Sequence, residues 1–261
     1  MDLPIQISPS HFEKVNQLGS GTIGKVYLAK EKSTQQEFAI KFIKTEITNN
    51  NEIIQYINEI SQVYHPIILR PFGYSLPDHS KKRPMSLVTN FQNNGSLSFL
   101  LQNPSELTDF RKLKILFGIA EGLRYLHENH FVHGDLTPGN ILLNENIEPI
   151  LTDYSLSKIK PRKTRIPPMN ICFYAPENDI TEVTASARDE NSESSPESPT
   201  MAIKQFSVID NFQDIEPSAD VFSYGMIVYT VITGSYPYTE EESKDVAIRI
   251  KQGERPPLLN S

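Results

Sequence analysis

The sequence predicts an α+β fold, with strands early in the chain and helices later. Residues 25–29 (KVYLA) and 37–43 (EFAIKFI) have the short, alternating, β-branched and aromatic character of strands. Residues 51–64, 107–129 and 220–234 instead repeat apolar side chains every three or four positions, as amphipathic or buried helices do. The length of 261 residues suits one large domain or two small lobes.

Composition narrows the class of protein. The net charge of −7 disfavours a general nucleic-acid partner. The single cysteine, Cys172, excludes an internal disulfide and argues against a zinc site, because no histidine cluster accompanies it. No basic leader precedes an apolar stretch at the N-terminus, and the longest apolar run, residues 226–232, is too short to span a bilayer. We therefore expect a cytoplasmic protein without membrane insertion.

The first motif is the glycine pattern of residues 18–26 (LGSGTIGKV), formed by Gly19, Gly21 and Gly24 and followed by Val26. Glycines at this spacing let a strand-turn-strand lie close over phosphates, because no Cβ blocks the backbone N–H groups. A glycine-rich hairpin without any ligand would show the same pattern. A dinucleotide-binding fold would need a helix after the glycines, whereas the next residues alternate as a strand.

The next candidate is Lys41, which follows Ala39 and Ile40 in the second strand pattern. A lysine on an edge strand often only faces solvent. Its place after a glycine-rich hairpin favours a phosphate ligand instead.

The middle of the chain, residues 131–143 (FVHGDLTPGNILL), sets an acid, a carboxamide and a glycine-containing turn between two apolar runs. His133, Asp135, Leu136 and Asn140 fit the spacing H-R-D-L-x-x-x-N, and with the two motifs above they resemble the protein kinase family. The resemblance covers roughly residue 12 to the C-terminus. It implies that Asp135 accepts the proton of the substrate hydroxyl and that Asn140 binds a magnesium ion.

The resemblance also implies a two-lobed architecture. Residues 12–89 would form a small lobe with an antiparallel sheet and one helix, and residues 90–261 a mainly helical large lobe, with ATP bound between them. By the same resemblance Thr89 is the gatekeeper, the backbones of Asn90 and Gln92 contact adenine, and Leu142 lies beneath it. The residues implied to bind ATP are Gly19, Gly21, Gly24, Val26, Ala39, Lys41, Thr89, Asn90, Gln92 and Leu142.

Thirteen residues beyond Asn140, Asp153 opens the sequence Asp153-Tyr154-Ser155. The family motif is D-F-G, so Asp153 would be the second magnesium ligand. Serine in place of glycine restricts the backbone freedom of this motif. Residues 175–177 match the family's A-P-E, which closes the activation segment.

Several positions depart from the family. On the helix of residues 51–64, the glutamate that pairs with the strand lysine would fall on Tyr56. Glu52 and Glu59 lie about one turn away on the same face, and either could take that role, with Glu59 favoured. Thr137 stands where serine/threonine kinases have lysine, and Gly134 where the family has arginine.

Composition changes at about residues 178–216, where acidic, serine and proline residues accumulate and predict a disordered insertion. It follows a basic run in residues 157–168. The sequence ends without a match to the last helices of the family domain.

We conclude from the sequence that the chain resembles an ATP- and Mg²⁺-dependent protein kinase of serine/threonine type, with protein substrates. The NGSL segment, residues 94–97, resembles the tyrosine-kinase-like group. The alternative is a pseudokinase that acts as a nucleotide-binding or scaffold module.

Overall fold

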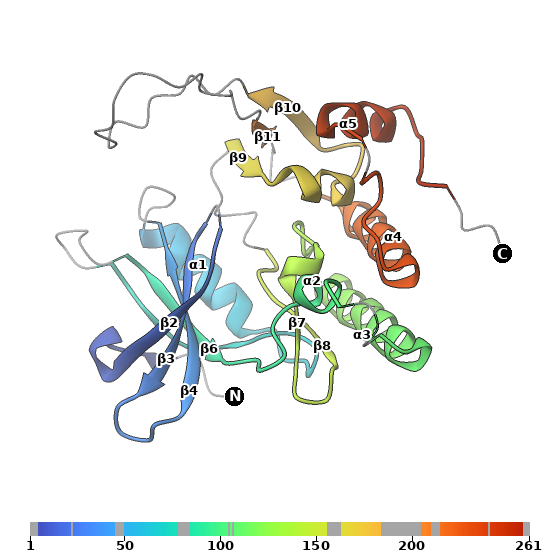
Figure 1. Ribbon diagram of the computed structural model, residues 1–261. Helices are drawn as coiled ribbons and strands as arrows, with labels where there is room; N and C mark the ends of the chain where they lie inside the picture. Colours follow the sequence, from blue (N-terminus) through green and yellow to red (C-terminus); the bar gives the residue numbers. More distant parts are fainter. Residues whose placement is uncertain are drawn as a thin grey trace, which may run out of the picture.

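The computed structural model describes residues 5–21, 23–44, 50–77, 84–103, 105, 107–155, 163–183, 205–209, 215–239 and 241–257. Figure 1 shows a strand-rich part on one side and the long helices on the other. Within the described ranges, no helix combines the length and the apolar character needed to cross a bilayer. The α+β, two-lobed class predicted from the sequence is confirmed.

The small lobe is a six-stranded sheet in the order β1-β5-β6-β4-β3-β2. Its strands are β1 (Ile5–Gln6), β2 (Phe12–Ser20), β3 (Gly24–Glu31), β4 (Glu37–Ile43), β5 (Pro71–Ser75) and β6 (Ser86–Asn90). All neighbours pair antiparallel except β1 and β5, which are parallel. The sheet is therefore mixed, and the lobe begins before residue 12, where the sequence had predicted its start.

Helix α1 (Asn50–Ser61) completes the small lobe. Its periodic residues Tyr56, Ile57 and Ile60 are buried in one cluster with Ile43 of β4 and Leu87 of β6. This packing on the sheet supplies the stabilisation that a twelve-residue helix lacks by itself.

The large lobe is built on α3 (Asp109–Glu128), packed against α4 (Pro217–Thr233) and the hairpin of β7 (Ile141–Leu143) and β8 (Pro149–Leu151). Thr108 caps α3 by accepting a hydrogen bond from the Arg111 backbone N–H at 3.3 Å, as its side chain type predicts. The lobe also contains the short α2 (Leu97–Leu100) and, at its end, α5 (Ser243–Lys251).

Two glycines let α3 approach the hairpin closely. A Cβ on Gly118 would lie 2.5 Å from Pro149, and one on Gly122 would lie 2.8 Å from Leu151. The glycines are four residues apart, so they share one helix face. Leu113 fits the three- or four-residue apolar period of α3, which predicts burial, but its side chain is 68% exposed. The buried positions of α3 lie on the face toward the hairpin and the face toward α4.

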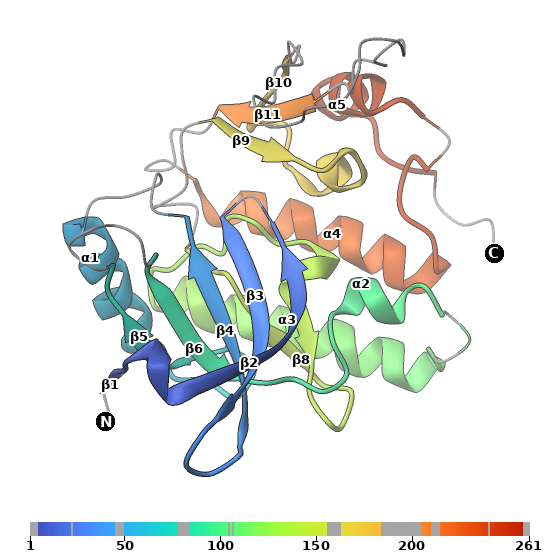
Figure 2. The ribbon, with the colours of Figure 1, turned by 60° about the vertical axis from the view of Figure 1, so that its left-hand side comes forward.

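A three-stranded antiparallel sheet, in the order β10-β11-β9, lies near α5 and away from the small lobe (Figure 2). It consists of β9 (Lys163–Ile166), β10 (Asp179–Val183) and β11 (Gln205–Ile209). The disordered insertion expected at about 178–216 therefore contains two strands, and the expectation is wrong for these two stretches. The pairing of β11 with β9 and of β10 with β11, which composition does not reveal, orders them. The acidic stretch between them, residues 184–204, lies outside the described residues.

Candidate active site

A cavity of about 730 Å³ lies between the small-lobe sheet and the large lobe. Its size falls in the range of small-molecule and cofactor sites. Of the residues implied to bind ATP, six line it: Gly19, Val26, Ala39, Asn90, Gln92 and Leu142. Gly21, Gly24, Lys41 and Thr89 are not among its lining residues.

The strand register explains this distribution. Val26 of β3 pairs with Lys41 of β4, and Ala39 pairs with Thr89 of β6. Lys41 and Ala39 are two positions apart and so point to the same side of the sheet. Lys41 thus lies one step further along the sheet from the cavity, toward the large-lobe carboxylates.

The three glycines of the hairpin differ in what surrounds them. A Cβ on Gly24 would lie 1.9 Å from the carbonyl oxygen of Phe42, whereas Gly19 and Gly21 have no atom within 4 Å of that position. The backbone N–H of Gly21 donates to the carbonyl of Gly24 at 2.8 Å and closes the turn. Close strand packing therefore requires glycine at position 24, while Gly19 and Gly21 leave open space above the turn.

Asp135 and Asn140 form one unit in the loop before β7. The Asn140 Nδ2 donates to the backbone carbonyl of Asp135 at 2.7 Å and to its Oδ2 at 3.1 Å. The five-residue spacing works because residues 138–140 form a 3-10 turn that brings the amide back to the acid. Gly139 and Leu142, on either side of Asn140, line the cavity.

Asp220 of α4 anchors the loop that carries Asp135 by hydrogen bonds to its backbone. Its carboxylate is 1% exposed and accepts hydrogen bonds from the backbone N–H groups of His133 at 2.7 Å and Gly134 at 2.8 Å. His127 Nε2 lies 2.8 Å from the same carboxylate. Gly134 has φ of 73°, a left-handed conformation that favours glycine where the family has arginine.

Lys41 and Asp153 form an ion pair. The Lys41 Nζ lies 2.5 Å from the Asp153 Oδ2, and the side chains are only 16% and 22% exposed. Glu59, the favoured partner from the sequence, instead accepts a hydrogen bond from Gln55 at 3.0 Å. The side chain of Glu52 lies outside the described residues. The acidic partner of Lys41 in this structure therefore comes from the large lobe.

Tyr56 lies on α1 at the position where the resemblance places the family's glutamate. Burial raises the pKa of the Tyr56 hydroxyl well above its ordinary value, and the nearby Tyr154 and Asp153 raise it further. The ring is therefore neutral and cannot replace a carboxylate as a partner for Lys41.

The residues after Asp153 are fixed to both lobes. Tyr154 is buried and its hydroxyl donates to the Ile60 carbonyl of α1 at 3.3 Å. The Ser155 hydroxyl donates to the Val132 carbonyl at 3.1 Å, and its backbone N–H donates to the His133 carbonyl at 3.1 Å. The serine hydroxyl thus adds a hydrogen bond, which glycine could not make, to the segment just before Asp135.

The oxygen donors fit a magnesium ion. Asp153 offers a carboxylate and Asn140 a carboxamide oxygen, the ligand types that Mg²⁺ prefers together with phosphate oxygens and water. Within the described part of the chain, no group of three or more His, Cys, Asp and Glu side chains could hold a metal. Two protein ligands suit an ion that arrives with a nucleotide.

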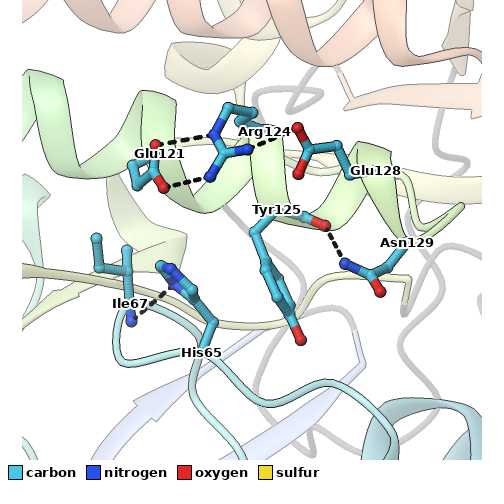
Figure 3. Close-up of polar contacts among 7 residues, drawn as sticks. All are labelled: His65, Ile67, Glu121, Arg124, Tyr125, Glu128 and Asn129. Carbon is cyan, nitrogen blue, oxygen red and sulfur yellow. Dashed lines mark hydrogen bonds and ion pairs between the residues drawn. The ribbon is translucent and has the colours of Figure 1, made fainter.

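A further contact joins the two lobes (Figure 3). His65, in the loop after α1, stacks on Tyr125 of α3 with ring centroids 4.7 Å apart, and its Nδ1 accepts from the Ile67 backbone N–H. The Tyr125 hydroxyl accepts from the Tyr64 backbone N–H at 3.1 Å. Arg124, the residue before Tyr125 in α3, donates hydrogen bonds to both Glu121 and Glu128.

Sequence reasoning missed one residue of the site, Tyr174. Its hydroxyl donates to the Asp135 Oδ1 at 2.6 Å. Its place directly before the A-P-E motif was the available signal, but that spacing does not say where the ring points. The cavity also extends past the implied residues to Asn93, Ser98 and Asn103.

The two lobes, the cavity between them and the acid–amide pair beside it define a kinase-type two-lobed fold. The chain belongs to the protein kinase family: the family model described as "Protein kinase domain" matches residues 12–185.

Individual relatives agree with this assignment. Ephrin type-B receptor 1-A of Xenopus laevis is 29% identical over 254 residues, which cover 94% of this chain and 23% of the receptor. Aurora kinase of Dictyostelium discoideum is 28% identical over 241 residues, which cover 91% of this chain and 54% of that kinase. Ephrin type-A receptor 3 of Danio rerio is 28% identical over 260 residues, 97% of this chain and 23% of the receptor. The chain spans about half or less of the length of these relatives.

Proposed function

We propose that the chain transfers the γ-phosphate of ATP to serine or threonine hydroxyls of protein substrates. The observation that carries the proposal is the convergence of two pairs, Asp135 with Asn140 and Lys41 with Asp153. The backbone N–H of Thr152 donates to the Asn140 carbonyl at 3.0 Å, so the two large-lobe ligands are held in one frame. This frame adjoins the cavity that would hold the nucleotide.

Each residue has a chemical role in this proposal. Asp135 orients the acceptor hydroxyl and takes its proton. Asn140 and Asp153 hold the magnesium ion, which neutralises charge on the phosphates when bound. With nucleotide and metal bound, Lys41 would contact the phosphates and Asp153 would hold the metal. The chain's own residues thus supply orientation and charge, which is most of what phosphoryl transfer requires.

The serine/threonine type rests on the resemblance of the NGSL hinge to the tyrosine-kinase-like group. The single buried cysteine, Cys172, suits a reducing compartment, and we propose the cytoplasm. We propose protein substrates and no nucleic-acid partner.

A pseudokinase is the second candidate, and Tyr56 favours it. With a neutral phenol at this position, α1 offers Lys41 no carboxylate there, and the ion pair with Asp153 occupies both a phosphate ligand and a metal ligand. Such a module would act as a scaffold that binds other proteins through its surface, with or without a bound nucleotide.

The deciding experiment is a transfer assay with labelled ATP and Mg²⁺ on a generic basic protein, with Asp135→Asn as the matched control. Active chain should label the substrate, and Asp135→Asn should remove transfer while nucleotide binding, measured by thermal shift, is retained. If Asp135→Asn transferred phosphate as fast as the parent chain, Asp135 would not be the base. Tight Mg²⁺-ATP binding without any transfer would establish the pseudokinase instead.

A further inference from the structure

The small-lobe sheet has a second hollow on the face opposite the nucleotide cavity. Val26 of β3 lines the nucleotide cavity, so its neighbours Lys25 and Tyr27 point to the other face. Both neighbours line a hollow of about 460 Å³, a size typical of ligand pockets. Phe42 of β4 lines it too and pairs with Lys25 in the strand register. The hollow therefore opens on the end of the sheet formed by β4, β3 and β2 (Figure 2).

The floor of this hollow is aromatic. The rings of Tyr27 and Phe42 meet edge to face, with centroids 5.8 Å apart and an interplanar angle of 78°. Phe42 also packs against the buried cluster on this face of the sheet, which includes Phe38 and Ile40. Both floor rings remain partly exposed. The floor can therefore receive an apolar side chain without rearrangement of the sheet.

Three lysines surround this floor: Lys14 of β2, Lys25 of β3 and Lys44, which follows β4. All three are exposed, and none forms an ion pair with an acidic residue that the structure describes. The Lys14 Nζ lies over both rings, 4.6 Å from the Tyr27 centroid and 4.0 Å from the Phe42 centroid. No acidic residue of the described ranges lines the hollow. Three positive charges thus face one apolar hollow.

We propose that this hollow is a docking site for an acidic segment of another protein. An aromatic side chain of the segment packs on Tyr27 and Phe42, and carboxylates on either side of it pair with the three lysines. Exposed ion pairs contribute little singly, so the apolar contact supplies most of the affinity and the lysines select an acidic sequence. The inference holds for an active kinase and for a pseudokinase alike, because it uses none of the residues assigned to phosphoryl transfer.

The number of lysines favours a short peptide over a larger anionic surface. Segments that bind anionic membranes typically carry about 4–8 lysines and arginines, and proteins that bind DNA contact about 6–10 phosphates. This hollow has three lysines, and the whole chain has a net charge of −7. A membrane or a nucleic acid meets the repulsion of the whole chain, whereas a short segment meets only the local positive charge.

Binding is tested with the fluorescein-labelled peptide EDEFDED and the full chain, by fluorescence anisotropy. Alanine in place of the peptide's phenylalanine should raise the Kd about tenfold, and added salt should weaken binding. A peptide with lysines in place of the acidic residues should not bind. Mg²⁺-ATP should not compete, because the nucleotide cavity lies on the other side of the sheet. Equal binding of the acidic and basic peptides, or competition by Mg²⁺-ATP, would overturn the inference.

Charge reversal on the chain tests the lysines. Lys25→Glu and Lys44→Glu should each raise the Kd of the peptide about tenfold, because each replaces an attraction by a repulsion. Lys32→Glu is the matched control, since Lys32 is exposed, directly follows β3 and does not line the hollow. It should retain the parental affinity. An equal loss of affinity in Lys32→Glu would show a general charge effect and contradict a site at the hollow.

Cross-linking tests the position of the peptide. A benzophenone amino acid in place of the peptide's phenylalanine should form cross-links to Tyr27 or Phe42, identified by mass spectrometry. Cross-links to the basic run of residues 157–168 or to the large lobe would refute the docking site. Vesicles that contain phosphatidylserine provide the last comparison. If they sediment the parent chain but not Lys25→Glu, and the peptide does not bind, the hollow binds a membrane and the inference is wrong.

Discussion

Gly24→Ala tests the close approach of β3 to β4. The new Cβ would lie 1.9 Å from the Phe42 carbonyl oxygen, and a backbone atom cannot rotate away. Contacts below 3.0 Å essentially never occur, so the strands must separate by about 1 Å at the start of β3. Overpacking of this kind typically costs about 1–3 kcal/mol, and one weakened ladder hydrogen bond adds about 1 kcal/mol.

We expect Gly24→Ala to lower the free energy of unfolding by about 3 kcal/mol in urea titrations, and the melting temperature by roughly 6–12 °C. Gly21→Ala is the matched control, because no atom lies within 4 Å of its added Cβ. It should leave stability within about 1 kcal/mol and weaken ATP binding instead. Equal stability of Gly24→Ala and the parent chain would refute the argument that strand packing requires this glycine.

Three further predictions concern other parts of the chain. Burial raises the pKa of the Cys172 thiol from 9.0 to about 12, so the unfolded thiol loses its proton first as the pH rises. The free energy of unfolding should therefore fall above pH 9, by up to about 1.4 kcal/mol per pH unit from this group, and less steeply in Cys172→Ala. Gln35 has a left-handed φ of 62° in an exposed turn, so Gln35→Gly should raise the free energy of unfolding by about 1 kcal/mol. Gln36→Gly is the control and should lower it. Equal melting temperatures of the two variants would contradict this prediction. Thr137 lacks the charge of the lysine that serine/threonine kinases have at this position, so Thr137→Lys should raise kcat by up to about a hundredfold with little change in ATP affinity. No gain in kcat would favour the pseudokinase.

Local pattern was sufficient to predict the strands and helices that carry the site. Apolar residues alternate around β3 and β4 and recur every three or four positions in α3. Both patterns arise because one face of each element is buried, so they can be read from neighbouring residues in the sequence. The pairing of β1 with β5 could not be predicted, because two residues carry no period. Leu113 shows the opposite failure, since apolar residues on more than one face of α3 make the period ambiguous.

Motif spacing also predicts that Asp135, Asn140 and Asp153 form one group, although it could not give their contacts. Lys41 and Asp153 are 112 positions apart, and their ion pair depends on how the two lobes meet. Tyr174 reaches Asp135 across 39 positions through the path of a 3-10 turn. Sequence motifs do not reveal contacts between residues so far apart in the chain.

The short strand β1 covers the outer edge of β5. Without it, the backbone of β5 from Gly73 to Tyr74 would present an open edge, where a strand of another molecule could add. Ile7 packs against the same edge of β5, since its side chain occupies the space that a Cβ on Gly73 would take. A recombinant fragment that begins at Phe12, where the family match begins, should therefore be more prone to aggregate than one that retains Ile5.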